Sequence, residues 1–178
     1  KTLQLIVPCY NEAEALPLFF DAAAKVLDDL WQYEGRLLFV DDGSTDATLD
    51  MLKTLAQKDE RVKYLSFSRN FGKESAMLAG LRASTADVVA IMDADLQHSP
   101  ALLPEMLRAL DEGFDVAAAK RVDRSGEDRL KSRLSDRFYR VANRMMTVGI
   151  DAGAQDFRVM KRAVVDAILS MTEHRRFT

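Results

Sequence analysis

The sequence predicts an α/β fold built on a mainly parallel sheet, and three observations support this. Short apolar runs rich in β-branched residues alternate with longer segments whose apolar residues recur at helical spacing. Strands that alternate with helices form right-handed βαβ units, in which the strands are parallel. Two of the apolar runs end in aspartates, at Asp41-Asp42 and at Asp93-Ala94-Asp95. Ligands of such sheets bind beyond the carboxyl ends of the strands, so the pattern also indicates a site.

The expected elements follow one another without a long gap. The first strand covers residues 3–7, and Asn11 can cap the next helix, whose first turn carries acidic residues that suit the helix dipole. Gly35 separates that helix from the second strand. Ser99-Pro100 is typical of a helix start. The other strands are expected over residues 36–40, 62–67, 87–92 and 115–119, and the other helices over residues 46–58, 72–84 and 99–113.

The composition fits a single domain over residues 1–178. The chain is 48% hydrophobic and 30% charged, as in ordinary soluble globular proteins, and its net charge of −3 gives no reason to expect nucleic acid as a partner. The single Cys9 excludes an intrachain disulfide and favours a reducing compartment. No window reaches the roughly 18 apolar residues of a membrane helix. The chain starts without Met and stops abruptly, so we expect a soluble piece of a longer protein.

The two acidic strand ends predict a cation and a diphosphate. Repulsion between Asp93 and Asp95 is relieved by a bound cation or a shared proton. Together with Gln97 they supply oxygen ligands, which suit Mg²⁺ or Mn²⁺ rather than zinc. The alternative is a pair of solvated loop acids, and Asp42-Gly43-Ser44 also has ordinary turn chemistry. The sequence contains no phosphate-loop motif, no Gly-x-Gly-x-x-Gly after the first strand and no nucleophile elbow with a paired histidine.

The segment 120–144 is basic, whereas the whole chain is acidic. One interpretation is a solvated helix face. The other is a mobile cationic lid over an anionic pocket, which the flexible Ser125-Gly126 favours. The basic residues are Lys120, Arg121, Arg124, Arg129, Lys131, Arg133, Arg137, Arg140 and Arg144.

Six short motifs, in order, resemble a known family. They are Val-Pro-Cys-Tyr-Asn-Glu12, Val-Asp-Asp-Gly-Ser-Thr-Asp46, Ser-Arg-Asn-Phe-Gly-Lys-Glu74, Asp-Ala-Asp-Leu-Gln97, Ala-Lys-Arg121 and Gln-Asp-Phe-Arg158. They look like the GT-A catalytic domain of family 2 glycosyltransferases, in the branch of bactoprenol-phosphate glucosyltransferases and dolichyl-phosphate mannose synthases. The resemblance implies a Rossmann-like, mainly parallel twisted sheet flanked by helices. It also implies a C-terminal membrane region, which we expect to lie outside this piece of the protein.

The resemblance implies a role for each matching residue. The nucleotide and donor would be bound by Pro8, Tyr10, Asn11, Glu12, Asp42, Lys73, Asp93, Ala94 and Asp95. The metal would lie at Asp95 and Gln97, and the phosphates of donor and acceptor at Arg121, Lys131, Arg133, Ser135 and Arg158. Asp93, Asp156 and Arg121 would act in catalysis, Asp156 first by positioning and electrostatics and second as a base.

The implied activity is an inverting, metal-dependent transfer of a hexose from a nucleotide sugar to a polyprenyl phosphate. UDP-glucose is favoured as donor, although a GDP-linked sugar stays open. Such an enzyme of cell-envelope synthesis would work at the membrane surface, on the cytoplasmic face of the plasma membrane, and a homo-oligomer is compatible with it. Three alternatives remain: a saccharide acceptor, a receiver-like signalling domain, and a catalytically silent module that binds nucleotide sugars.

Overall fold

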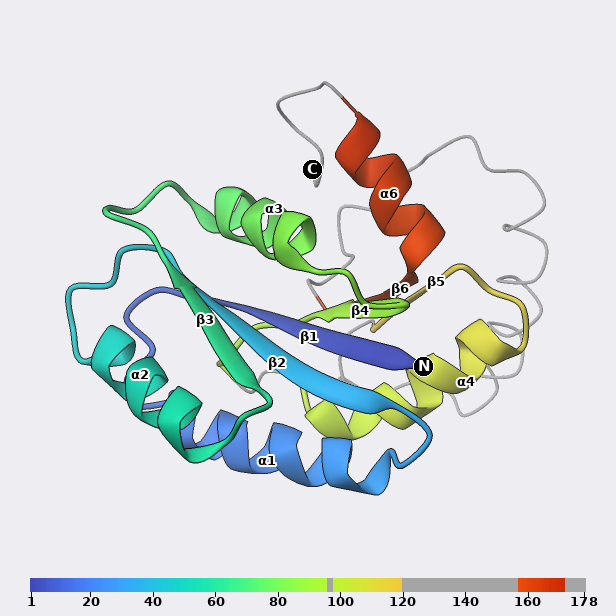
Figure 1. Ribbon diagram of the computed structural model, residues 1–178, viewed down its shortest axis with the longest axis horizontal. Helices are drawn as coiled ribbons and strands as arrows, with labels where there is room; N and C mark the ends of the chain where they lie inside the picture. Colours follow the sequence, from blue (N-terminus) through green and yellow to red (C-terminus); the bar gives the residue numbers. More distant parts are fainter. Residues whose placement is uncertain (96–97, 120–156, 172–178) are drawn as a thin grey trace, which may run out of the picture.

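A sheet divides the molecule into two helical layers (Figure 1). The computed structural model describes residues 1–95, 98–119 and 157–171. In these residues the sheet has six strands in the order β3-β2-β1-β4-β6-β5. The strands are β1 (Thr2–Cys9), β2 (Glu34–Asp41), β3 (Val62–Ser66), β4 (Val88–Ile91), β5 (Val116–Ala118) and β6 (Arg158–Lys161).

The expected α/β fold with a mainly parallel sheet is confirmed. Strand β1 pairs in parallel with β2 and with β4, and β2 pairs in parallel with β3. Strand β6 is the exception, because it runs antiparallel to both β4 and β5. Strand β6 was not predicted, because its four residues, Arg158–Lys161, alternate in neither burial nor polarity.

Each face of the sheet is covered by its own helices. One face carries α1 (Leu16–Asp29), α2 (Thr48–Lys58) and α4 (Leu103–Asp111), and the other carries α3 (Lys73–Ala83) and α6 (Arg162–Ser170) (Figure 1). Strand β1 is buried on both sides, because Leu3, Leu5 and Val7 belong to the first apolar cluster and Ile6 to the second. Such burial is typical of a central parallel strand.

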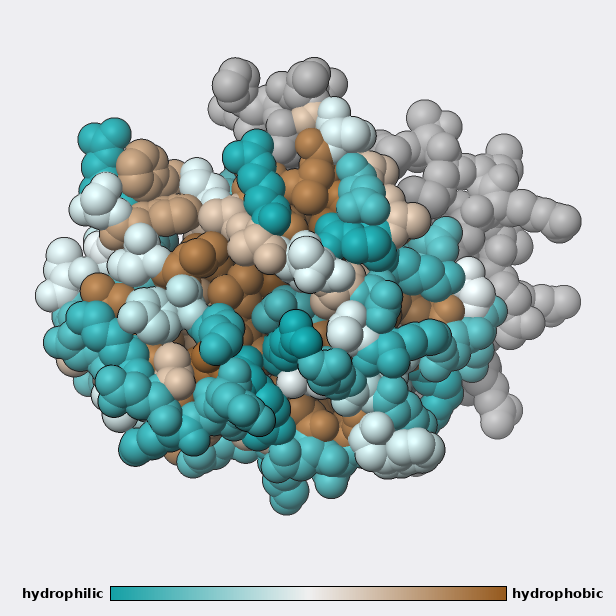
Figure 2. All heavy atoms as spheres, viewed as in Figure 1, coloured by the Kyte–Doolittle hydropathy of each residue, from teal (hydrophilic) through white to brown (hydrophobic). Residues whose placement is uncertain are grey.

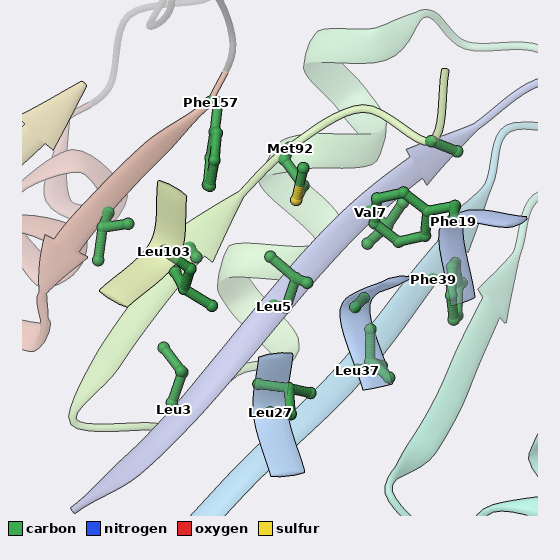
Figure 3. Close-up of a cluster of buried hydrophobic side chains, with 14 of the residues drawn as sticks. Leu3, Leu5, Val7, Phe19, Leu27, Leu37, Phe39, Met92, Leu103 and Phe157 are labelled. Carbon is green, nitrogen blue, oxygen red and sulfur yellow. The ribbon is translucent and has the colours of Figure 1, made fainter. Parts of the chain in front are cut away.

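The larger apolar cluster joins the sheet to α1 and α4 (Figure 3). The rings of Phe19 from α1 and Phe39 from β2 meet edge to face with their centroids 6.1 Å apart. Met92 and Phe157, which are also fully buried, extend this cluster toward the carboxyl end of β4. Burial of this kind contributes roughly 25 cal/mol per Å² of apolar surface and is the main force that holds the layers together.

Two boundary predictions are wrong. Asn11 does not cap a helix: it adopts a left-handed conformation with φ of 56°, and α1 begins at Leu16. Its side chain instead binds the loop after β2: Asn11 Oδ1 accepts the backbone N–H of Thr45 at 2.8 Å. Gly35 does not separate the units but lies inside β2, where it pairs with Leu3 of β1.

The Ser99-Pro100 start is confirmed with one difference. Ser99 Oγ accepts the N–H of Ala101 at 3.2 Å, but it caps a short 3₁₀ helix, η1 (Pro100–Leu102), which leads into α4. After α4, Gly113 adopts a φ of 109°, close to the expected helix end.

The visible surface is mainly hydrophilic along the edge where Figure 1 places α1 and α2 (Figure 2). Among the described residues, no helix has both the length and the apolar character needed to cross a membrane.

Helix α3 lies against the sheet at Gly80. A Cβ built at Gly80 would lie 2.4 Å from Cγ2 of Ile6, a buried β-branched side chain with little freedom to move. Only a residue without a side chain therefore allows this close approach of helix and strand.

We expect Gly80→Ala to destabilise the protein. Overpacking costs about 1–3 kcal/mol, whereas the gain in helix propensity is about 1 kcal/mol, so a net loss is expected. Urea unfolding followed by circular dichroism measures it. In an Ile6→Ala background the same substitution should cost much less, because the clashing methyl is gone. Equal costs in the two backgrounds would contradict the contact.

Candidate active site

The two acidic strand ends lie at the same edge of the sheet, as predicted. Strands β2 and β4 flank β1 and run parallel to it, so their carboxyl ends meet beside the residues that follow β1. Asp41 ends β2, Asp93 and Asp95 follow β4, and Tyr10 to Glu12 follow β1. The topology therefore brings together three segments that are far apart in the sequence.

Three carboxylates form the acidic centre of this edge. The pKa of Glu12 is raised by burial first, and then by the negative charges of Asp95, Asp93 and Asp46. Lys73, from the first turn of α3, lies here too, with its Nζ 2.6 Å from Oδ2 of Asp93. Lys73, expected among the donor-binding residues near Asp42, thus lies beside Asp93, and Ala94 between the two aspartates is buried.

Asp41 and Asp42, at the end of β2, are buried and hydrogen-bond to neighbouring segments of the protein. Asp41 accepts the N–H of Ser44 at 3.1 Å and the hydroxyl of Ser66 at 2.8 Å. Asp42 accepts the backbone N–H groups of Phe71 and Gly72, at 2.7 and 2.9 Å. Together these bonds fix the segment between β3 and α3 to the end of β2. Each oxygen of Asp42 retains a second lone pair, so this carboxylate can still accept a bond from a ligand.

Gly43 brings the same segment close to β2. It has a φ of 69°, and a Cβ at this position would lie 2.3 Å from the carbonyl carbon of Arg69. The Arg69 guanidinium lies 4.8 Å from the centre of the Phe71 ring, which itself meets Phe67 edge to face at 5.6 Å. No role for Arg69 or Phe67 was predicted, since a stack between non-adjacent residues leaves no periodic signal in the sequence.

An open pocket of about 380 Å³ lies between these segments. Tyr10, which is 44% exposed, stands at its border. Most of the residues in its wall are of polar types, and Arg69 adds a cationic group. The wall consists of Asp41, Gly43, Ser44, Thr45, Leu49, Ser66, Phe67, Ser68, Arg69 and Asn70.

Several predicted residues fall elsewhere. Gln97, Arg121, Lys131, Arg133, Ser135 and Asp156 lie outside the described residues, as does the whole basic segment. Arg158 is described: it opens β6 and pairs with Ile91 near the carboxyl end of β4, which places it beside the acidic edge. Cys9, also at this edge, is buried, and burial raises the pKa of its thiol, so it stays a neutral core residue.

The residues present are chemically suited to a hard divalent cation. Glu12, Asp93 and Asp95 provide oxygen donors, and a bound cation would relieve the repulsion that raises the pKa of Glu12. In the part of the chain that the structure describes, no three acidic, histidine or cysteine side chains are close enough to hold a metal by themselves. A metal would therefore also need ligands from Gln97 or from a bound phosphate.

The sequence profile described as glycosyl transferase family 2 matches residues 4–169, and the chain belongs to this family. The bactoprenol glucosyl transferase of Shigella phage SfX is 40% identical over 175 residues, which are 98% of this chain and 57% of that protein. This chain thus spans little more than half the length of that relative.

Solved structures confirm the GT-A fold. A mannosyltransferase from Pyrobaculum calidifontis, in complex with GDP-Man and Mn²⁺, has a TM-score of 0.60 at 22% identity, covering 93% of this chain and 46% of that one. Glucosyl-3-phosphoglycerate synthase from Mycobacterium tuberculosis, in complex with Mn²⁺, UDP and phosphoglyceric acid, has a TM-score of 0.61 at 20% identity, covering 92% and 57%. Membership of glycosyl transferase family 2 excludes the receiver-like alternative.

We expect Asp42→Ala to release the segment before α3. The substitution leaves the N–H of Phe71 without its acceptor and removes one of the two acceptors of the Gly72 N–H, which also donates to Asn70 Oδ1 at 3.0 Å. Loss of a hydrogen bond of this kind costs about 1 kcal/mol. Hydrogen exchange should therefore accelerate at the amides of Phe71 and Gly72. Asp50→Ala on the exposed side of α2 is the control and should leave both amides unchanged. Unaltered exchange in Asp42→Ala would show that the segment is held by other contacts.

Proposed function

We propose that this chain is the donor-binding domain of an inverting glycosyltransferase that moves a hexose from a nucleotide sugar to a polyprenyl phosphate. The observation that carries the proposal is the convergence of Glu12, Asp93 and Asp95 at the ends of β1 and β4. Family membership supplies the reaction class. The likeness to a bactoprenol glucosyl transferase supports the acceptor and favours UDP-glucose as donor.

The nucleotide would bind across the ends of β1 and β2. Tyr10 offers an exposed aromatic face at the pocket, and Asp42, which lies in the chain between Asp41 and Gly43 of the pocket wall, would accept a bond from the nucleotide base. Pro8 and Asn11 hold the backbone on either side of Tyr10. Glu12 and Asp93 would accept bonds from ribose or sugar hydroxyls, since carboxylates are the strongest acceptors available there.

The diphosphate would lie at the carboxyl end of β4. Asp95, with Gln97, would hold Mg²⁺ or Mn²⁺, whose positive charge stabilises the charge that develops on the leaving diphosphate. Lys73 supplies a fixed positive charge at the same place, where it now pairs with Asp93. Both solved relatives named above contain Mn²⁺, which supports the metal but leaves Mg²⁺ open.

The acceptor needs cationic groups more than it needs a base. A phosphomonoester with a second pKa near ~6 is largely ionised at neutral pH, so it can attack without losing a proton. Its repulsion from the diphosphate must be offset, and arginine binds phosphate oxygens bidentately. Arg158 at the acidic edge, with Arg121, Lys131, Arg133 and Ser135, would serve this purpose, while Asp156 would position the reacting groups. Attack opposite the leaving group inverts the anomeric centre.

Asp95→Asn should abolish most of the metal-dependent nucleotide binding. Loss of a charged ligand weakens the cation site, and we expect the affinity for UDP with Mn²⁺ to fall by about tenfold or more. Calorimetry with and without a chelator measures the metal-dependent part. The control is Asp50→Asn on the exposed surface of α2, where Asp50 pairs with Lys53. Equal metal-dependent affinity in Asp95→Asn and the parent protein would refute the metal assignment.

The acceptor class is tested with matched lipids. The complete protein should transfer labelled hexose from UDP-glucose to a short-chain polyprenyl phosphate and not to the corresponding polyprenol, which lacks the ionised nucleophile. Arg158→Ala should reduce transfer more than it reduces UDP affinity. Efficient transfer to the polyprenol or to a soluble saccharide would favour the alternative acceptor, and nucleotide binding without any transfer would favour a silent module.

A further inference from the structure

The loop after β1 is held by the loop after β2. Three consecutive backbone N–H groups, those of Asn11, Glu12 and Ala13, each donate to a side-chain oxygen of segment 44–48. The acceptors are Ser44 Oγ at 2.9 Å, Thr48 Oγ1 at 2.8 Å and Asp46 Oδ2 at 3.2 Å. The shape of the first loop therefore depends on side chains that follow it by 33 residues or more.

Thr48 differs from the other two acceptors in its burial. Its relative exposure is 0%, whereas Asp46 is exposed and Ser44 is partly so. Water can replace an exposed acceptor, but a buried N–H that loses its partner remains unsatisfied. Although burial opposes it, hydrogen bonding from the side chain and backbone of Thr48 and the backbone of Ala13 lowers the pKa of Asp46. The Thr48 hydroxyl thus accepts the N–H of Glu12 and also forms a hydrogen bond with Asp46.

Glu12 connects the hydrogen bond of Thr48 to the acidic centre. Its N–H is bound by Thr48, its carbonyl accepts the N–H groups of Ala15 and Leu16 at the start of α1, and its side chain lies among the charges of Asp93 and Asp95. The backbone on both sides of the carboxylate is therefore fixed.

We propose that Thr48 is a positioning residue, which holds the backbone of Glu12 so that its carboxylate faces the bound nucleotide. This inference rests on the proposed function, because it takes Glu12 as a nucleotide contact. Thr48 itself is fully buried, and its hydroxyl accepts the N–H of Glu12. Its effect on binding should therefore pass entirely through Glu12.

Two substitutions separate positioning from general stability. Thr48→Val keeps the shape of the side chain but removes the oxygen, whereas Thr48→Ser keeps the oxygen and loses a buried methyl. If Thr48 positions Glu12, calorimetry should show the affinity for UDP with Mn²⁺ falling about tenfold in Thr48→Val and staying within about twofold in Thr48→Ser. Thr48→Ser should still lower the melting temperature, because a cavity replaces the methyl.

The matched control lies on the same helix. Thr54 donates its hydroxyl to the carbonyl of Asp50 on the exposed side of α2, so Thr54→Val makes the same chemical change away from the site. It should leave the affinity for UDP unchanged. Should Thr48→Val fail to fold by circular dichroism, Thr48→Cys takes its place, because a thiol is a weak acceptor.

A double-mutant cycle shows whether the effect passes through Glu12. In a Glu12→Ala background, Thr48→Val should cause no further loss of affinity. The inference is overturned if Thr48→Val binds UDP as the parent does, if Thr48→Ser loses as much affinity as Thr48→Val, or if the loss persists without the Glu12 carboxylate. A parent protein that binds neither UDP nor GDP would overturn the proposed function itself.

Discussion

The parallel pairing of β1 with a strand on each side is the constraint on which the site depends. Pro8 and Cys9 pair with Val40 and Asp41 of β2, and Ile6 pairs with Ile91 of β4. Because of this register, the segments that follow β1, β2 and β4 leave the sheet at the same edge. Their residues therefore lie close together. A shift by one residue would turn every side chain to the opposite face and separate the acids.

Burial divides the acidic residues of this edge into two groups. Asp41 and Asp42 are almost fully buried, and their oxygens accept bonds from the protein itself. Glu12, Asp93 and Asp95 remain at least partly exposed, and the pKa of Glu12 is raised first by its partial burial and then by the charges of Asp95 and Asp93. The first group supports the frame of the site, and the second carries negative charge at its surface, where Lys73 pairs with Asp93.

The order of neighbouring residues predicted those features of the structure that depend only on neighbouring residues. The apolar run of β4 and the aspartates that follow it were placed correctly, because a buried strand and its end are visible in the order of residues. The roles of Asn11 and Gly35 were not, because a partner such as Thr45 lies 34 residues away and leaves no trace in the neighbouring sequence. The antiparallel β6 was not predicted for a related reason: its four residues acquire strand geometry only by pairing with β4 and β5.

The inward hydrogen bonds of Asn11, Glu12 and Ala13 have a consequence for the energetics of the site. In many nucleotide-binding folds the amides after the first strand bind phosphate, and the ligand completes their hydrogen bonding. Here those amides are satisfied by the protein, so the loop keeps its shape when no ligand is present. This half of the site is preorganised, and the entropy of ordering it is a cost of folding rather than of association.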